Sequence, residues 1–454
     1  MRIGVRLTGT SARGALVDGG TVLTSGSSLP VGLATGALSG LLRTLAAAAP
    51  TGVASVTWDV TTVLKEALAQ PVGRAIPPAL RAGPVAALRV LPRPPDSPAL
   101  AGHPSPLVRS LVTWRSTVRG GHDLFGNELA ALDLKAAEEA GRAVRDLGLN
   151  TVALTATGTR AIHEEVVASR LLETCPELRL CLSHEAGGLG LLEREATTVV
   201  NAALLDVAEG LITICVQATN ALGPRVTCWF ATGDGGRVSA QRLRWMPVVG
   251  LAATPATALI GAAVLAGTPN AAVALVEASH IGVGAVRDGL PQVASGLPKS
   301  VGVRTVDPQP VLTLGAVDTA PAVGALLAGH TGQGKGVVAA YNAGGNAVAE
   351  AMARSGGSGL TLVRPEADIA AVGAACTEPS AWLDLLVSAD TPQQLETEQL
   401  YAERRALGMV TANGAQPGSE RIAGSVATRV GFPRRRLYRL QVRASSRTTK
   451  EGTS

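Results

Sequence analysis

Two stretches of the chain share one pattern of apolar and small residues. In each stretch an apolar run enters a turn of small residues, and a second apolar run then ends at Asp-Gly; the stretches are residues 3–19 and 274–289. Asp-Gly after an apolar run is a strong signal for a β-hairpin. Because one hairpin opens the chain and the other lies in its second half, we predict a duplicated domain with a cleft between the two copies.

Between the two hairpins the apolar pattern alternates between strand and helix periods. The predicted strands are residues 53–58, 151–156, 178–183, 226–231 and 248–252. The predicted helices are residues 30–48, 133–147, 161–173, 191–210 and 255–267. Residues 69–110 are rich in Pro, Arg and Ala and predict an irregular segment. The alternation favours an α/β fold class built from layered domains.

The second half of the chain shows a weaker pattern. Residues 336–341, 360–363 and 437–442 predict strands, and a helix is expected after Ala370. Residues 315–336 are Gly-rich and predict a loop. We therefore expect an N-terminal lobe over residues 1–195, a C-terminal lobe over 196–444 and a disordered tail over 445–454.

Composition and charge narrow the possible partners. The chain has 454 residues, enough for two or three domains, and aromatic residues make up only 2%, so the cores must consist of Ala, Val and Leu. The formal net charge is +5, but the clearest basic cluster is Arg434, Arg435 and Arg436. No aromatic residues accompany that cluster, which favours a solvated segment over a nucleic-acid surface.

The cysteines and the apolar stretches predict the compartment. The five cysteines form no C-x-x-C pair, which favours reduced thiols in a cytoplasm over disulfides or a zinc site. Arg2 and Arg6 interrupt the first apolar run, so no signal peptide is expected. Residues 245–276 carry no charge but contain three prolines, which favours buried strands and a helix over a membrane span. We expect no membrane partner and no metal ligated by the cysteines.

Several segments in order along the chain resemble the hydantoinase A/oxoprolinase family. The specific part is Ser-His-Glu at 183–185, Gly-Leu-Leu-Glu-Arg-Glu at 190–195 and Asn-Ala at 201–202. Weaker matches are residues 120–123, 126, 128, 163–165, 234–235, 261–263, 302–305 and 363–366. The resemblance implies two actin-like (ribonuclease H-like) lobes with a cleft between them. It also implies an ATP-dependent hydrolase or carboxylase, with cyclic amides such as hydantoins or 5-oxoproline among the substrates.

The same resemblance implies ATP and Mg²⁺ as cofactors, held by the turns of the two hairpins. In the family manner, ATP would phosphorylate an unreactive carbonyl or enol oxygen, with glycine N–H groups lining the phosphates. The matching nucleotide-binding positions are Gly9 and Thr10 in the first turn, and Gly282 and Gly284 after the second. Gly344 and Gly345 lie where the superfold meets adenosine, although a helix-start turn without ligand explains them equally well.

Both turns depart from the family pattern at the positions of their carboxylates. Arg6 stands for the first Asp, Thr8 for the first Gly, and Leu275 for the Asp of the second turn. At about 4 Å and an effective dielectric of about 20, each unit-charge interaction is worth about 4 kcal/mol, so Arg6 converts attraction for Mg²⁺ into repulsion of similar size. Two functions stay open: an ATP-dependent cyclic-amide hydrolase with unconventional nucleotide contacts, or a non-catalytic relative.

The non-catalytic relative would be a partner or regulatory subunit of an active homologue, in a hetero-complex or a homo-oligomer. Residues 329–335 match the spacing G-x-x-x-x-G-K but lack the Ser or Thr that follows it, which favours a flexible loop.

Three histidines lie beside carboxylates and are the remaining candidates for chemistry. They are His122 beside Asp123, His163 beside Glu164 and Glu165, and His184 beside Glu185. Such pairs can act as acid and base or ligate a metal, but hydrogen-bonded structural histidines fit as well. The catalytic candidates are His122, Asp123, His184 and Glu185.

Overall fold

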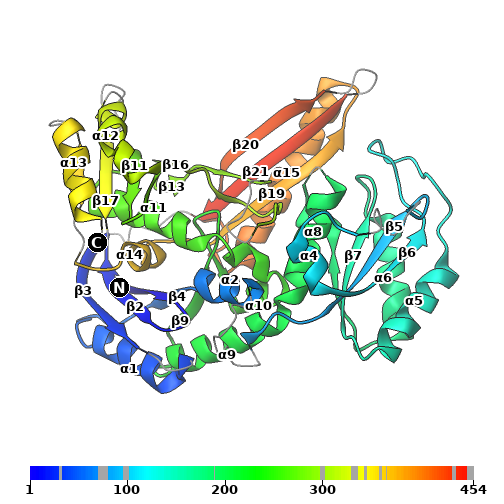
Figure 1. Cartoon of the computed structure of the whole chain (residues 1–454), viewed down its shortest axis with the longest axis horizontal. Coiled ribbons are helices and arrows are strands. Elements are labelled where there is room, and N and C mark those ends of the chain that lie inside the picture. The colour runs from blue at the N-terminus through cyan, green and yellow to red at the C-terminus, as the bar shows by residue number, and fades with distance from the viewer. Residues whose placement is uncertain are drawn as a thin grey trace.

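The computed structural model describes most of the chain. The described residues are 1–29, 33–69, 80–95, 102–188, 190–296, 302–328, 336–341, 345–356, 360–363, 366–431 and 436–446. Their strands form three larger sheets and two smaller ones, with helices packed on them (Figure 1). The segment 329–335 and Gly344 lie outside the described residues.

The first sheet begins with the N-terminal hairpin. Its strands are β1 (Arg2–Leu7), β2 (Ala12–Asp18), β3 (Thr21–Ser28), β4 (Ser55–Asp59), β9 (Thr227–Ala231) and β10 (Arg237–Ser239), in the order β10-β9-β4-β1-β2-β3. β1, β2 and β3 are antiparallel, whereas β4 runs parallel to β1 and β9 parallel to β4. The turn after Asp18 places Gly19 and Gly20 at φ of 53° and 91°, which glycine adopts without strain. The predicted first hairpin is confirmed.

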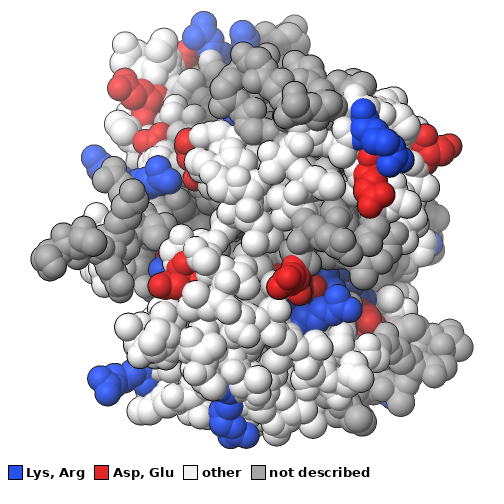
Figure 2. Space-filling model, turned by 90° about the vertical axis from the view of Figure 1, so that its left-hand side faces the viewer, with Lys and Arg blue, Asp and Glu red and all other residues white. Residues whose placement is uncertain are grey.

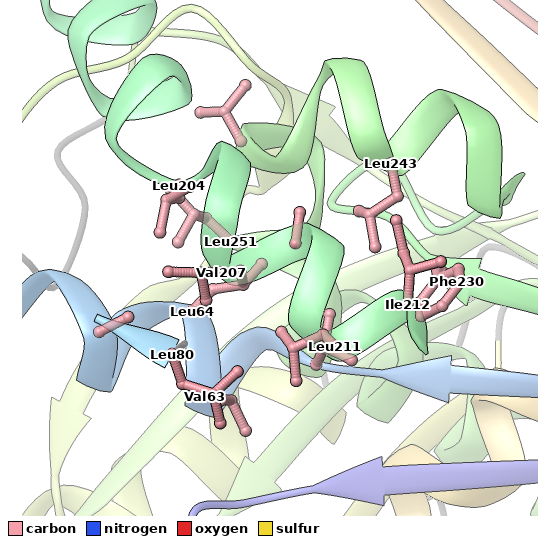
Figure 3. Close-up of a cluster of buried hydrophobic side chains, with 14 of the residues drawn as sticks. Val63, Leu64, Leu80, Leu204, Val207, Leu211, Ile212, Phe230, Leu243 and Leu251 are labelled. Carbon is pink, nitrogen blue, oxygen red and sulfur yellow. The ribbon is translucent and has the colours of Figure 1, made fainter. Parts of the chain in front are cut away.

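Three helices pack on this sheet, α1 (Thr35–Ala46), α2 (Thr61–Ala69) and α9 (Leu205–Asn220), and α8 (Leu191–Ala203), which precedes α9, contributes to the same core cluster. Val63 and Leu64 of α2 lie among Leu204, Val207 and Leu211 at the start of α9 (Figure 3). The segment predicted as one helix over residues 191–210 forms two helices, α8 and α9, with a bend of 49° between them. Among the described residues no single helix passes the length and hydropathy test for a membrane span, and this bent pair passes it only jointly.

A second, all-parallel sheet is inserted between α2 and α8 and lies at the right of Figure 1. Its strands are β5 (Val85–Leu91), β6 (Val112–Arg119), β7 (Thr151–Ala156) and β8 (Arg179–Leu182), in the order β6-β5-β7-β8. Its helices are α4 (Pro106–Leu111), α5 (Leu134–Asp146), α6 (Ile162–Thr174) and α7 (Ser183–Ala186). Asp133 caps α5 by accepting from the Ala136 amide at 3.0 Å, as the sequence predicted.

The prediction that residues 69–110 are irregular is wrong for β5 and α4. Arg89 interrupts the apolar run of β5 and hides the strand from a pattern-based reading. In the fold, Arg89 is buried and donates twice to Glu195, from Nε at 2.9 Å and from Nη2 at 2.7 Å. A bidentate partner from α8 makes a buried cation tolerable inside the strand.

The third sheet begins with the second hairpin and repeats the arrangement of the first. Its main strands are β11 (Ala271–Val276), β12 (His280–Arg287), β13 (Leu290–Pro291), β17 (Gly336–Tyr341) and β18 (Thr361–Val363), in the order β13-β12-β11-β17-β18, with β16 (Thr313–Ala316) paired to β12. The β12–β13 turn holds Asp288 and Gly289 at φ of 50° and 77°. In both sheets the opening hairpin is antiparallel and the next strands run parallel to its first strand. The predicted repeat is visible in this shared order.

Two further predictions around this sheet are wrong. Residues 248–252 form the 3₁₀ helix η3 (Pro247–Gly250) and the turn into α11 (Ala253–Leu265), because Pro247 lacks an N–H for a ladder. The loop expected over 315–336 contains β16, η4 (Val317–Thr319) and α12 (Ala320–Ala328), whose Ala- and Leu-rich composition favours helix. The helix α13 (Asn346–Gly356) precedes β18.

α11 and α14 (Ile369–Ala375) cross between the first and third sheets. The crossing depends on three glycines: a Cβ at Gly4 would lie 1.9 Å from the Ala371 carbonyl oxygen, at Gly261 2.0 Å from that of Ile369, and at Gly373 1.8 Å from that of Thr257. Real Cβ atoms never come so close. The junction of β1, α11 and α14 is therefore packed backbone to backbone.

The C-terminal part adds a three-stranded sheet, β19 (Ser380–Ser388), β21 (Leu437–Ser446) and β20 (Glu420–Val430), covered by α15 (Pro392–Ala412). The prediction of a disordered tail from residue 445 is wrong for Ser445 and Ser446, which belong to β21 and pair with its neighbouring strands. Residues 447–454 lie outside the described part. The lobe boundary expected after residue 195 lies inside α8, and β9 and β10 beyond it complete the first sheet. Two smaller strands, β14 (Val293–Ala294) and β15 (Gln309–Pro310), pair with each other.

On the side opposite the inserted sheet, the described residues carry positive and negative charges intermixed. In the view of that side, Lys, Arg, Asp and Glu lie scattered among uncharged residues (Figure 2). This distribution agrees with a sequence in which charged residues are only 17%.

Candidate functional site

A cavity of about 710 Å³ lies where the first and third sheets meet, at the place of the predicted cleft. We call it the central cavity. Its wall combines the end of β1, the helix α2, the first turns of α11 and α14, and the β11–β12 hairpin with β16. The lining residues are Arg6, Thr61, Thr62, Lys65, Glu66, Ala69, Thr254, Pro255, Ala258, Leu275, Val276, Glu277, His280, Gly282, Leu312, Leu314, Ala340, Asp368, Ile369 and Ala370.

Arg6 joins the first sheet to the start of α14. Its Nη2 lies 3.3 Å from Asp368 Oδ2, and Asp368 is almost fully buried, with 3% of its side chain exposed. The same carboxylate caps α14 by accepting from the Ala371 amide at 3.1 Å, and Arg13 of β2 approaches it to 3.8 Å. The cation that replaces the family's carboxylate is thus held in a buried ion pair.

Asp59 is a buried acid beside Arg6 that the sequence reasoning left out. It ends β4, is paired in register with Arg6 and is 0% exposed. Its Oδ1 accepts from the Thr61 amide at 3.1 Å, and its Oδ2 has no hydrogen-bond partner among the described residues. Burial raises the pKa of Asp59; Thr254, Thr61 and, least of these, the positive charge of Arg6 act in the opposite direction. An Asp directly after the strand predicted over residues 53–58 was the signal that could have identified it.

The first turn closes on itself. The Thr8 hydroxyl donates to the Ser11 carbonyl at 3.1 Å and accepts from the amides of Ser11 at 2.9 Å and Thr10 at 3.3 Å. These two N–H groups are the donors that a phosphate would need, and a glycine in place of Thr8 would leave them free. The Thr10 and Ser11 amides of this turn are therefore used internally.

In the second turn, backbone and side-chain contacts join Glu277 and His280. The Glu277 amide donates to the His280 carbonyl at 2.9 Å, and His280 Nε2 lies 3.6 Å from Glu277 Oε2. A Cβ at Gly282 would lie 3.7 Å from a methyl carbon of Leu312 and of Leu314, and one at Gly284 would lie 2.9 Å from Leu312. Both glycines thus pack against leucine side chains.

Of the predicted adenosine-site pair, only Gly345 is described. It is buried, and its carbonyl accepts from the Ala349 amide at 2.9 Å, which opens α13. This contact fits the helix-start turn that the sequence analysis left as the alternative.

The histidine candidates lie at the carboxyl edge of the inserted sheet, and none of them lines the central cavity. Glu164, 0% exposed, accepts from Ser183 Oγ at 2.6 Å, from the amides of Ser183 and His184 at 2.9 Å each, and from His184 Nδ1 at 2.8 Å. Burial alone would raise the pKa of Glu164, but His184 and Ser183 outweigh it, so its pKa is lowered. His184 Nε2 faces the Gly158 carbonyl at 3.2 Å, so both ring nitrogens are engaged.

The other candidates are similarly held. His163 Nδ1 accepts from the Gly121 amide at 2.8 Å, and its ring centre lies 4.3 Å from that of His122. Burial lowers the pKa of His122, whose Nδ1 has no partner among the described residues. Asp123 accepts from the amides of Phe125 and Asn127, each at 2.8 Å, which closes the loop after β6.

Glu185 lines a cavity of about 300 Å³ together with His184, between the inserted sheet and the C-terminal sheet. Burial raises the pKa of Glu185, and Arg242 opposes the shift. The structure thus separates the catalytic candidates from the nucleotide-binding candidates into two regions. Among the described residues, no group of three or more His, Cys, Asp or Glu side chains could hold a metal ion.

Comparisons with known proteins identify the fold. No family model and no curated protein matches the sequence. The structure is similar to that of ATP-dependent caprolactamase from Pseudomonas jessenii, with a TM-score of 0.75, 13% identity, and coverage of 99% of this chain and 88% of that chain. It is also similar to nucleotide-free acetone carboxylase, with a TM-score of 0.63, 12% identity, and coverage of 98% and 88%. These neighbours have the actin-like fold of the hydantoinase/oxoprolinase family, so the expected α/β class and fold are confirmed.

Proposed function

We propose that this chain is a hydantoinase/oxoprolinase-type protein that has lost Mg²⁺-ATP-dependent phosphoryl transfer and acts as a non-catalytic partner or regulatory subunit of an active homologue. The observation that carries the proposal is the buried ion pair of Arg6 with Asp368 at the end of β1. The guanidinium stands at the position where the family places its anchor, and it uses the charge of Asp368 that a divalent cation would otherwise need.

The residues present do not fit Mg²⁺-ATP. The Thr8 hydroxyl takes the turn amides that would line a phosphate, and Leu275 adds no charge opposite Arg6. Asp368, the acid that faces the cavity beside Arg6, already neutralises Arg6 and caps α14. We therefore derive no reaction step through ATP or magnesium.

Calorimetry with Mg²⁺-ATP tests the proposal, together with an assay of ATP turnover in the presence of hydantoin, 5-oxoproline or caprolactam. We expect neither binding in the micromolar range nor turnover. Micromolar binding that requires Mg²⁺, with amide-stimulated ATP hydrolysis, would refute the loss of function.

A rescue variant locates the defect. The double substitution Arg6→Asp with Leu275→Asp returns both family carboxylates and should restore measurable Mg²⁺-ATP binding if these two positions caused the loss. The matched control is Arg145→Asp with Leu147→Asp on the exposed end of α5, which makes the same charge change away from the cavity. Binding gained by the control as strongly as by the rescue variant would contradict the assignment.

The second candidate function is an ATP-dependent hydrolase of a cyclic amide, the first alternative from the sequence. One observation favours it: Asp59 places a buried carboxylate on the strand next to Arg6, where it could replace the missing family residue. If calorimetry detects Mg²⁺-ATP, the Asp59→Asn variant should abolish that binding.

The partner is open to direct test. Co-purification from the native host should retrieve a homologous subunit if the chain belongs to a hetero-complex, and light scattering of the purified protein reports a homo-oligomer. The cytoplasmic location expected from the cysteines stays a prediction; all five are free thiols in the structure.

A further inference from the structure

We infer that the central cavity binds an uncharged, largely apolar small molecule in the place where a nucleotide would lie. This inference rests on the proposed loss of Mg²⁺-ATP binding, and it assigns the cavity a ligand class that this loss does not require. Three features of the wall support this inference. They are its apolar side chains, the leucines that lie over the second hairpin, and the pairing of its charged side chains.

Much of the wall consists of aliphatic side chains. Leu275, Leu312 and Leu314 come from the hairpin half, and Pro255 and Ile369 from the starts of α11 and α14. Leu314 is 68% exposed, and Leu275 and Leu312 are only partly buried. Exposed aliphatic surface inside a concave site is what an apolar ligand removes from water, at about 25 cal/mol for each Å² buried.

The leucines also close the route to the hairpin backbone. Leu312 and Leu314 lie over Gly282 within 3.7 Å of the position of a Cβ. A phosphate needs exposed glycine N–H groups at this place, whereas an apolar ligand needs the methyl groups that are there.

The charged side chains of the wall are engaged with one another or with neighbours. Arg6 pairs with Asp368 at 3.3 Å, and Glu277 with His280 at 3.6 Å. Lys65 and Glu66 also have interaction partners. An ionic ligand would have to break one of these pairs, so a neutral ligand is favoured on charge complementarity.

The size of the cavity suits this class. A volume of about 710 Å³ lies within the range of roughly 300–1,000 Å³ that small-molecule sites occupy. Such sites are mostly apolar with a few oriented polar groups. Here Thr62 and Thr254 carry hydroxyl groups on the α2 and α11 side, whereas the Thr61 hydroxyl donates to the Gly250 carbonyl.

A neutral fluorescent probe tests the inference on the full chain. N-phenyl-1-naphthylamine should bind saturably, with one probe per chain and enhanced fluorescence. The Leu314→Asp variant places a carboxylate on the wall at an exposed position that tolerates it, and probe affinity should fall about tenfold or more because the charge must be desolvated. Leu275→Asp should act in the same direction.

Leu147→Asp is the matched control. Leu147 is 58% exposed and is the C-cap residue of α5, a helix of the inserted sheet. Its probe affinity should equal that of the unmodified chain. Circular dichroism on every variant separates loss of binding from loss of fold, and the exposed position of Leu314 keeps the test valid if Leu275→Asp fails to fold.

The outcomes separate this inference from the proposed function. Absence of saturable probe binding, or equal binding by folded Leu314→Asp and the unmodified chain, overturns the inference while leaving the calorimetric result untouched. Displacement of the probe by Mg²⁺-ATP would overturn both. Tighter binding of the anionic 1-anilinonaphthalene-8-sulfonate than of the neutral probe, reversed by Arg6→Met, would show an anion site and refute the neutral class.

Discussion

Replacing Arg6 with methionine removes the cation of the central ion pair while keeping an aliphatic stem of similar length. Asp59 and Asp368 then remain in this site without the cation. Asp59 is 0% exposed, and the side chain of Asp368 is 3% exposed. Removing one partner of a buried pair costs about 3–5 kcal/mol. Because the Arg6 side chain is 23% exposed and Arg13 still approaches Asp368 at 3.8 Å, the lower end applies. We expect a loss of about 3 kcal/mol, equivalent to about 6–12 °C in Tm for a unit of 150–250 residues.

The loss should depend on pH through Asp59. Its folded pKa is raised above the unfolded value of 3.8, so the folded state holds the proton more tightly and stability falls as pH rises from that value through the folded pKa. Thr254 and Thr61 oppose the rise more than the charge of Arg6 does, so Arg6→Met removes only part of that opposition. The loss in Tm of the variant should therefore be larger at pH 8 than near pH 4.

Thermal unfolding followed by circular dichroism and by calorimetry at both pH values measures this difference. Arg13→Met is the control, because its 52% exposed side chain should contribute at most about 1 kcal/mol. Adding Asp59→Asn to Arg6→Met should recover part of the stability that is lost at pH 8. Equal losses at pH 4 and pH 8, or no recovery in the double variant, would refute the electrostatic reasoning.

Two further predictions concern the fold around the two candidate regions. Glu164→Gln should cost about 3 kcal/mol at pH 7, because it leaves buried donors without a carboxylate. Since the pKa of Glu164 is lowered, its contribution is present above the unfolded value of 4.5 and is lost as pH falls through the folded pKa, so the variant should match the unmodified chain in acid. Denaturant unfolding at pH 7 and pH 3 checks this. Gly373→Ala should prevent soluble expression or lower Tm by more than 6 °C, because its Cβ would lie 1.8 Å from a carbonyl oxygen. The control Gly40→Ala in α1, with nothing within 4 Å, should raise stability by about 0.5–1 kcal/mol, and a similar result for both would contradict the packing argument.

Parts of the fold could be predicted from the sequence because they depend on neighbouring residues. The strand at 151–156 was predicted with its observed bounds, because a short, mostly apolar run with β-branched residues between turn residues has few alternatives. Asp288-Gly289 and Asp133 were equally readable, since a turn with positive φ and a helix cap are properties of neighbouring residues. The repeat of hairpins, and with it the cleft, followed from the same local signals.

Features that depend on a residue far away along the chain could not be predicted from the sequence. Arg89 made β5 resemble a loop until Glu195 of α8 supplied its counter-charge. The C-terminal segment was reduced to one strand, whereas the chain forms β19, α15, β20 and β21 there. Long-range pairing can override local propensity in this way.

The sequence by itself determined that Arg6 and Leu275 stand where the resemblance implies carboxylates, because residue identity is enough to fix the charge at a position. Only the tertiary structure decided what those replacements do. It brought Asp59 and Asp368 to Arg6, turned the Thr8 hydroxyl onto the amides of its own turn, and laid leucines over Gly282. The physical reason is that charge and hydrogen-bonding capacity act through distance and burial, and these are set by elements that are remote along the chain.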